Sequence, residues 1–320
     1  LPVVENKPVA EDTAILRLRD GQLRRMSPRM VDKYLAQPGA KDEVVETIQT
    51  ATDETLYFFT NRGNCFMLDV TRIPETMKLK DRGSLLTGLI AGLADHEHAV
   101  ALVCVKSDEM AKKGDFLFIT KNGQVKRTAA AEYGIRRARF AAINLKGNDE
   151  LVGMVQVDPE DKDDIILITQ LGMALRFKLD TVSCTGRATA GVRGIDVGKD
   201  DEVRWFEIPK AGDMLFVLSD RGFGKRMLSD DVERQGRAGK GQKLLPMNKT
   251  GETGTQVAVC LNVTGAKSVR VEQKHGHTVL LNMDEIAVER RASKGQLLVN
   301  VLLDDVVQYG ALTAETKDEK

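Results

Sequence analysis

The chain has 320 residues, of which 42% are hydrophobic and 29% are charged, so it can form a substantial core. Its 47 Lys and Arg residues balance 47 Asp and Glu residues, which counts against binding of a strongly charged partner unless the fold segregates the charges. No apolar run has the length of a membrane span, so no membrane partner is expected. The first residues, "LPVVENKPVAEDT", resemble the middle of a longer polypeptide.

A hairpin pattern recurs six times along the chain, roughly every fifty residues. It consists of an apolar strand, a short turn with glycine and a second strand that often carries Lys or Arg. The six copies are "AILRLRDGQLRRM", "LYFFTNRGNCFML", "FLFITKNGQVKRT", "IILITQLGMALRF", "MLFVLSDRGFGKRM" and "VRVEQKHGHTVLL". Asp20-Gly21 and Asn122-Gly123 are turn pairs that tolerate the positive φ of tight hairpins. The other turn glycines are Gly63, Gly172, Gly222 and Gly276.

Further short strands lie between the hairpins, such as "HAVALVCV", "LVGMVQV" and "QVAVCLNV". Each repeat therefore offers about four strands, which is typical of a propeller blade. A solenoid and a pair of β-sandwiches are the alternatives. The even spacing favours a closed ring, because a ring removes exposed sheet edges. We expect an all-β, six-bladed propeller over residues 13–310, after a linker at 1–12 and before a charged tail at 311–320.

The segments that follow the hairpins are rich in basic residues, whereas acidic residues collect in runs such as "DPEDKDD" and "GKDDE". If the blades surround a ring, equivalent segments lie on the same part of its rim and form a basic belt. The predicted contact residues of this belt are Arg24, Arg25, Lys126, Arg127, Arg136, Arg137, Arg139, Arg187, Arg193, Lys225, Arg226, Arg234, Gln235, Arg237, Gly239, Lys240, Gly241, Lys243, Arg290, Arg291 and Lys294.

The segment "RQGRAGKGQK" at 234–243 is similar to a nucleotide-binding loop, but the residues at two diagnostic positions exclude that interpretation. A P-loop requires glycine where the chain has Arg234 and a hydroxyl residue where it has Gly241. Glycine beside Arg or Lys instead lets backbone N–H groups approach phosphates of a nucleic acid. Aromatic residues do not interleave with the basic runs, which favours a duplex backbone over stacked single strands.

Other site chemistries find little support in the sequence. The four cysteines are widely spaced and are expected to be reduced. The pairs His96/His98 and His275/His277 lack the further ligands of a zinc site, so no metal is expected. No nucleophile and base recur in a motif context, which argues against a hydrolase site in a propeller channel.

The repeated hairpins, "GRATAGVRGI" and "RGFGKRM…RQGRAGKGQKL" together resemble the C-terminal domain of the A subunit of bacterial type IIA topoisomerases, gyrase and topoisomerase IV. The resemblance covers nearly the whole chain. It implies a six-bladed β-pinwheel whose outer rim binds and bends duplex DNA. Gln235, Arg237, Gly239, Lys240 and Gly241 match the family's glycine-rich basic box, whereas Gly236 and Ala238 depart from its commonest form.

The same resemblance implies a domain that is not an enzyme by itself and holds no cofactor. ATP and Mg, the cleavage core with its catalytic tyrosine, and the B subunit of the heterotetramer would belong to the rest of a cytoplasmic, nucleoid-associated topoisomerase. The first bend, "YLAQPGAK", keeps Gln37, Gly39 and Lys41 but inserts Pro38 and loses the paired glycines, which favours topoisomerase IV over gyrase. A protein-interaction propeller without DNA binding is the alternative function.

Overall fold

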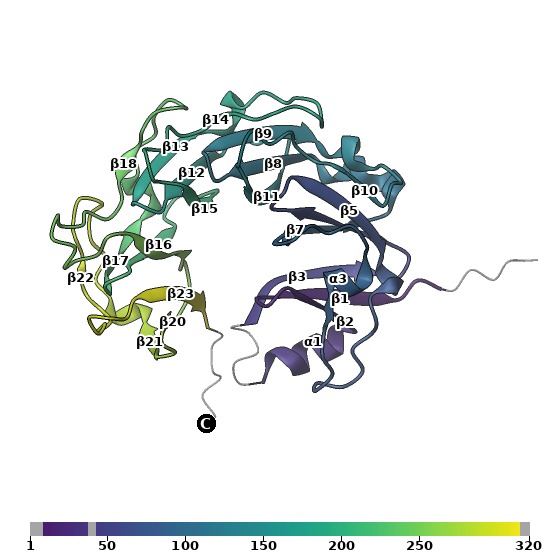
Figure 1. The fold of residues 1–320 in the computed structure, drawn as a ribbon, viewed down its shortest axis with the longest axis horizontal. Coiled ribbons are helices and arrows are strands. Elements are labelled where there is room, and N and C mark those ends of the chain that lie inside the picture. The colour runs from purple at the N-terminus through teal and green to yellow at the C-terminus, as the bar shows by residue number, and fades with distance from the viewer. Residues whose placement is uncertain (1–8, 38–42, 314–320) are drawn as a thin grey trace, which may run out of the picture. The chain divides into compact units, whose positions relative to one another are not determined.

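The structure is a computed structural model that describes residues 9–37 and 43–313. It is an all-β fold with six antiparallel sheets and little helix, as the hairpin repeats predict. Figure 1 shows its sheets and short helices, and the chain divides into two compact units. One comprises residues 1–114, 129–144 and 186–188, and the other comprises residues 115–128, 145–185 and 189–320.

The first unit holds two four-stranded sheets. The first has the order β3 (Val44–Ala51), β1 (Asp12–Leu18), β2 (Gln22–Met26), β6 (Ser84–Leu85). The second has the order β10 (Arg139–Ala141), β5 (Asn64–Asp69), β4 (Thr55–Thr60), β7 (Ala99–Val105). The short helices α1 (Pro28–Leu35) and α3 (Leu86–Leu89) also lie in this unit.

The second unit holds four sheets. The third sheet of the chain has the order β11 (Leu151–Val157), β8 (Asp115–Thr120), β9 (Gln124–Ala129), β14 (Val192–Arg193), and the fourth has the order β15 (Val203–Glu207), β12 (Asp164–Thr169), β13 (Met173–Lys178), β18 (Gln242–Lys243). The fifth has the order β19 (Val257–Asn262), β16 (Met214–Ser219), β17 (Phe223–Leu228), β22 (Gln296–Leu297). The sixth has the order β21 (Thr278–Asn282), β20 (Ser268–Gln273), β23 (Val307–Leu312). Within the described residues the sixth sheet therefore has three strands, one fewer than predicted.

The six predicted hairpins are confirmed, and each contains its turn glycine in the left-handed region. The φ angles run from 76° at Gly63 to 91° at Gly276. Gly123 has a second reason to lack a side chain, because a Cβ there would lie 2.6 Å from the Ile195 carbonyl oxygen. The turns thus set the register in which β1 pairs with β2, β4 with β5, and so on through β20 with β21.

The fourth strand of a sheet comes from the next repeat along the chain. Strands β6, β10, β14, β18 and β22 each follow the hairpin of one repeat and pair with the second hairpin strand of the preceding repeat. The sequence predicts about four strands per repeat but not this exchange. The consequence is that the basic segment of one repeat runs along the outer edge of the sheet before it.

The core lies between neighbouring sheets, and strand alternation explains it. Ile165 and Leu167 of β12 pack with β8 and β9, while Ile166 and Ile168 of the same strand pack with β16. The continuous apolar run "IILI" is therefore buried on both faces. In the first unit, the outer face of the first sheet packs against Val31 and Tyr34 of α1. In the described residues, no helix has the length and apolarity needed to cross a membrane.

Candidate nucleic-acid interface

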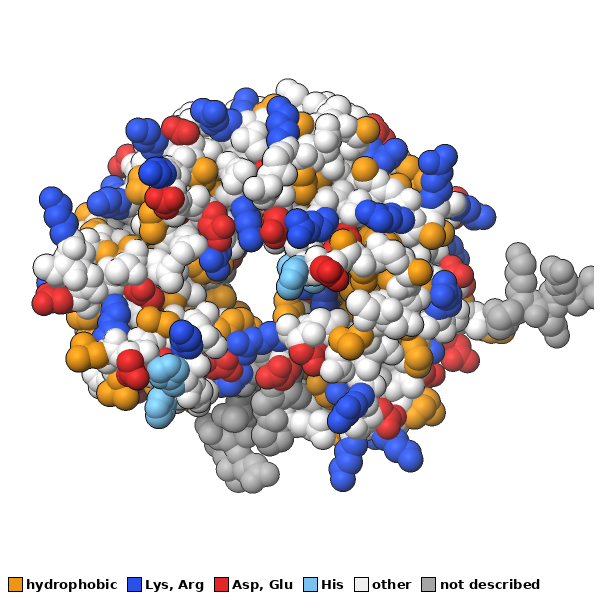
Figure 2. Space-filling model, in the orientation of Figure 1, with side chains coloured by type: hydrophobic (Ala, Val, Ile, Leu, Met, Phe, Trp, Pro, Cys, Tyr) orange, Lys and Arg blue, Asp and Glu red, His pale blue; other side chains and the backbone are white. Residues whose placement is uncertain are grey.

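The predicted interface follows the outer edges of the sheets, where each repeat leaves its hairpin through a bend and enters a short outer strand. A backbone bond fixes the start of the bend in each of three repeats: the amides of Thr185, Gln235 and Glu289 each donate at 2.8 Å to the carbonyls of Arg127, Arg176 and Arg226. We call residues 182–193, 232–243 and 286–297 the outer segments. Figure 2 shows Lys and Arg side chains projecting near β14 and β18, which end two of these segments.

Glycine allows each outer strand to approach the neighbouring backbone. A Cβ at Gly241 would lie 2.4 Å from the Ala174 carbonyl oxygen, and a Cβ at Gly295 would lie 2.3 Å from that of Gly224. Gly241 also has a φ of 79°. The glycine of the "AGKGQK" pattern therefore serves strand packing, whereas the sequence predicts an approach to phosphate.

The structure divides the predicted residues by exposure. Arg24, Arg187, Arg226, Arg237, Gly239, Gly241 and Arg291 are half-buried. The exposed members are Arg136, Arg137, Arg139, Arg193, Arg234, Gln235, Lys240, Lys243, Arg290 and Lys294.

Four predicted contacts are corrected, because their side chains are buried and engaged within the chain. They are Arg25, Lys126, Arg127 and Lys225. Arg25 Nε donates to the Ile73 carbonyl at 2.7 Å. Lys126 lies over the Phe118 ring at 5.3 Å. Side chains with less than a tenth of their surface exposed cannot reach a phosphate without local unfolding.

Arg127 is held mainly by an ion pair, whereas Lys225 is held by backbone carbonyls. Arg127 Nε donates to Asp115 at 2.6 Å and its Nη2 donates to the Pro159 carbonyl at 2.7 Å. Lys225 Nζ donates to the carbonyls of Arg290, at 2.9 Å, and Arg291, at 2.6 Å, and to that of Ser293. Burial lowers the pKa of the Lys225 ammonium to about 8. The buried lysine thus anchors the outer segment 286–297 through that segment's backbone carbonyls.

The sequence prediction missed Arg176, which organises an ion-pair network under the "RQGRAGKGQK" segment. Arg176 Nε donates to the buried Asp164 carboxylate at 2.7 Å, and Arg234 Nε donates to the same oxygen at 2.9 Å. Arg176 Nη1 also contacts Asp230 at 3.2 Å. The position of Arg176 in its hairpin matches those of Arg25, Arg127 and Arg226, so aligning the repeats would have found it.

Acidic runs and basic outer segments lie at different edges of the sheets. The run from Asp158 to Asp163 joins β11 to β12 at the end of the sheet opposite the hairpin turn, and Asp200 to Glu202 precede β15 at the turn end. The outer segments run along the remaining edge. The outer segments carry more basic than acidic residues, with Glu233 and Glu289 as their acids, so the charges are partly segregated at the level of single sheets.

Aromatic rings near the basic runs are buried. Phe140 follows Arg139 directly in the sequence, against the prediction that aromatic residues are absent from these runs. Its ring is buried and lies 5.4 Å from the Arg187 guanidinium. Arg139 lies over the buried ring of Phe66 at 5.5 Å. These rings support the arginines from below and do not offer a stacking surface for bases.

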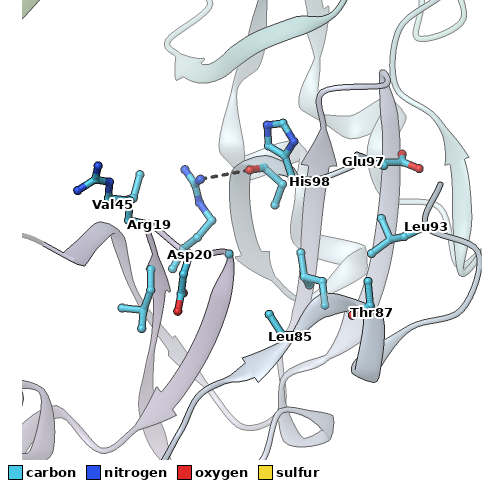
Figure 3. A pocket seen from close by; sticks show the side chains of 13 residues that line it. Arg19, Asp20, Val45, Leu85, Thr87, Leu93, Glu97 and His98 are labelled. Atoms are coloured by element: carbon cyan, nitrogen blue, oxygen red, sulfur yellow. Dashed lines mark hydrogen bonds between the residues drawn. The ribbon is translucent and has the colours of Figure 1, made fainter. Parts of the chain in front are cut away.

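A cavity of about 300 Å³ in the first unit contains two carboxylates (Figure 3). Asp20 accepts hydrogen bonds from the amide and side chain of Gln22, at 3.0 and 2.7 Å. Glu97 accepts from Thr60 Oγ1 at 2.6 Å and from Asn64 at 2.8 Å. Both acids are thus engaged by turns of the chain itself. Among the described residues, no group of three His, Cys, Asp or Glu side chains is placed to hold a metal ion.

Comparison with known proteins agrees with this architecture. The family model of the DNA gyrase C-terminal domain, a beta-propeller, matches residues 114–158, 163–210 and 213–254. This chain belongs to that family. It is 32% identical to the A subunit of DNA gyrase from Deinococcus deserti over 98% of its own length. It is 33% identical to the A subunit of DNA topoisomerase 4 from Bacillus subtilis over 74% of its length. The predicted resemblance to the C-terminal domain of these topoisomerases is confirmed.

A solved C-terminal domain of DNA topoisomerase IV shares the fold, with a TM-score of 0.83 at 24% identity over 95% of this chain and 94% of that one. The chain spans 40% of the length of the Deinococcus protein and 29% of the Bacillus protein. Relatives of both types match at similar identity, so the choice between gyrase and topoisomerase IV stays a prediction. Of the first bend, Pro38, Gly39 and Lys41 lie outside the described residues, and Gln37 is exposed.

Proposed function

We propose that this chain binds duplex DNA without sequence preference and bends it along the outer segments, as a non-catalytic domain of a type IIA topoisomerase. The observation that carries the proposal is the repetition of exposed cations at equivalent places. Lys240 and Lys294 occupy one such place in successive outer segments, and Arg193 and Lys243 occupy another. Evenly repeated cations along sheet edges suit the regular phosphates of a duplex backbone and carry no base specificity.

The remaining parts of the proposal concern the whole enzyme. The chain would present DNA to the cleavage core of the same polypeptide, which works with the B subunit in an ATP-dependent heterotetramer. The site of action would be the nucleoid in the cytoplasm. We favour topoisomerase IV over gyrase because the first bend lacks the paired glycines of a complete box.

Salt titration of duplex binding tests the DNA proposal. A phosphate neutralised by a cation releases counterions, so log K should fall steeply with log salt, with each contact contributing a slope of about 0.9. We expect Lys240→Gln and Lys294→Gln each to lower that slope by about this amount, with no change in sequence preference. Binding that is equal at low and high salt, or absent at low salt, would reject the proposal and leave the protein-interaction propeller.

A further inference from the structure

Three half-buried arginines at equivalent positions share one contact. Arg237 Nη1 donates to the carbonyl of Arg193 at 2.5 Å, and Arg291 Nη1 donates to the carbonyl of Lys243 at 2.9 Å. Arg187 Nη1 donates to the carbonyl of Ala141. The three acceptors are also equivalent, because Ala141, Arg193 and Lys243 end the outer strands β10, β14 and β18.

Arg237 and Arg291 therefore each connect their own segment to the outer strand that precedes it, and Arg187 makes the same contact with β10 inside the first unit. Backbone bonds reinforce the central connection: the Ala238 amide donates to the Gly194 carbonyl at 2.7 Å, and the Asp196 amide donates to the Gly239 carbonyl at 2.9 Å. The Arg237 Nε atom is buried and makes no hydrogen bond. Two of the three guanidinium nitrogens are thus either bonded to the protein or buried against it, which leaves less of this group for a phosphate than an exposed cation offers.

The exposed cations of the same segments behave differently. Lys240 and Lys294 lie three residues beyond Arg237 and Arg291, and their side chains are exposed. Arg193 is also exposed and forms a long ion pair with Asp196, at 3.7 Å. The outer segments thus combine one inward arginine with outward cations that follow it in the chain.

We infer that Arg187, Arg237 and Arg291 are positioning residues that hold the outer strands in place. Within the second unit, Arg237 and Arg291 fix the spacing of successive outer strands, and with it the spacing of the exposed cations. This inference rests on the proposed function and assigns these three residues a role other than the predicted phosphate contact. A stiff duplex resists bending, so it follows a curved surface only if the cations that hold it keep their spacing. Cations on segments that move independently would still attract a straight duplex.

Two triple variants that remove equal charge from the same segments separate positioning from phosphate neutralisation. Arg187→Gln with Arg237→Gln and Arg291→Gln removes the inward arginines. Arg193→Gln with Lys240→Gln and Lys294→Gln removes the exposed cations. The measurements are the salt slope of binding to a short duplex, FRET between the ends of a long duplex, and urea unfolding to establish that both variants are folded.

The inward-arginine variant should bind the short duplex within about twofold of the wild type and keep its salt slope, yet lose most of the FRET change that reports bending. The exposed-cation variant should lose about 2.7 from the slope, about 0.9 for each contact. Hydrogen exchange should also accelerate in β10, β14 and β18 of the inward-arginine variant only, since this contact exists without DNA.

Two results would overturn the inference. One is an equal loss of salt slope in both variants, which would make the inward arginines phosphate contacts. The other is undiminished bending by a folded inward-arginine variant. Failure of the proposed function would give a different result: the wild type itself would bind no duplex, and the exposed-cation variant would not differ from it in binding. The positioning role would then be rejected as well. Arg237→Lys adds a conservative check, because it keeps the charge but not the planar fork that reaches the carbonyl, and should bend DNA poorly.

Discussion

At the scale of single residues, neighbours in the sequence differ in burial because they lie on opposite faces of a strand. Lys225 and Arg226 are adjacent on β17, where successive side chains alternate between faces. Lys225 is fully buried and holds three carbonyls, while Arg226 is half-buried and its Nε donates to the Ile286 carbonyl at 2.7 Å. A count of basic residues therefore overstates the charge that a segment presents to a ligand.

Ala238 provides a residue-scale prediction, because it holds a φ of 69° that L-residues rarely adopt. Ala238→Gly should raise the free energy of unfolding by roughly 1 kcal/mol by removing the Cβ strain, which exceeds the entropy cost of glycine. Ala292 occupies the equivalent exposed place in the next repeat and is not among the residues with positive φ. Ala292→Gly should therefore lower stability by about 0.4–1 kcal/mol. Urea unfolding of both variants measures this, and shifts of the same sign would contradict it.

Lys225 gives a second prediction, in which stability depends on pH. Its pKa in the folded protein is about 8, below the ordinary lysine value that applies to the unfolded chain. Between these two values the unfolded state binds more protons, so the contribution of Lys225 to stability rises as pH rises through this window. The stability difference between wild type and Lys225→Met should therefore be larger at about pH 9.5 than at about pH 7.

The comparison needs a lysine control, since other groups also titrate in this range. Lys240→Met removes an exposed lysine from the neighbouring outer segment, and its stability difference from the wild type should stay constant across the same pH window. A difference for Lys225→Met that shrinks with rising pH would mean that the three carbonyl contacts favour the ammonium more than burial opposes it.

At the scale of elements, Asp164 connects a strand to the outer segment beside it. Asp164→Asn should cost about 3–5 kcal/mol, because it removes the buried carboxylate that pairs with both Arg176 and Arg234 and leaves Arg176 only the more exposed Asp230. Asp163→Asn, at the neighbouring residue, is the matched control. The Asp163 carboxylate pairs with the exposed Lys210, so the loss of stability should stay below about 1 kcal/mol. Chemical unfolding measures both, and equal losses would show that Asp164 is not a structural centre.

The elements also show what the sequence can and cannot predict. Hairpins were predictable because turn glycines and alternating apolar strands carry a strong local pattern. The outer strands β14, β18 and β22 have two residues each, too few for any periodicity, and their partners lie in the preceding repeat. The exchange of strands, and with it the packing role of Gly241 and Gly295, therefore depends on contacts that no local pattern records.

At the scale of the whole molecule, the charge balance in the sequence pointed to segregation, and the alternation of basic outer segments with acidic end loops agrees with it. The sequence could not separate exposed from buried cations. That distinction arises when one repeat folds onto the next, as with Lys225, whose three acceptors come from the following repeat. The candidate site consequently has fewer residues than the sequence predicts, and its exposed cations recur at equivalent places in successive outer segments.

The last prediction concerns how far the molecule wraps DNA. The exposed cations among the predicted contacts lie in repeats three to six, from Arg136 to Lys294, and the first bend lacks the paired glycines of a complete box. We therefore expect DNA to bend along these later repeats without completing a chiral turn. When relaxed, nicked plasmid is bound by this chain, sealed by ligase and freed of protein, its linking number should shift little.

The exposed-cation variant Arg193→Gln with Lys240→Gln and Lys294→Gln serves as the control for this measurement, and should reduce any shift to that of plasmid alone. A strong positive shift that this variant abolishes would show gyrase-type wrapping, because only a path with consistent handedness stores writhe when the nick is sealed. In that case the first bend must contact DNA despite its incomplete box, Lys41→Ala should remove the shift, and the preference for topoisomerase IV would be wrong.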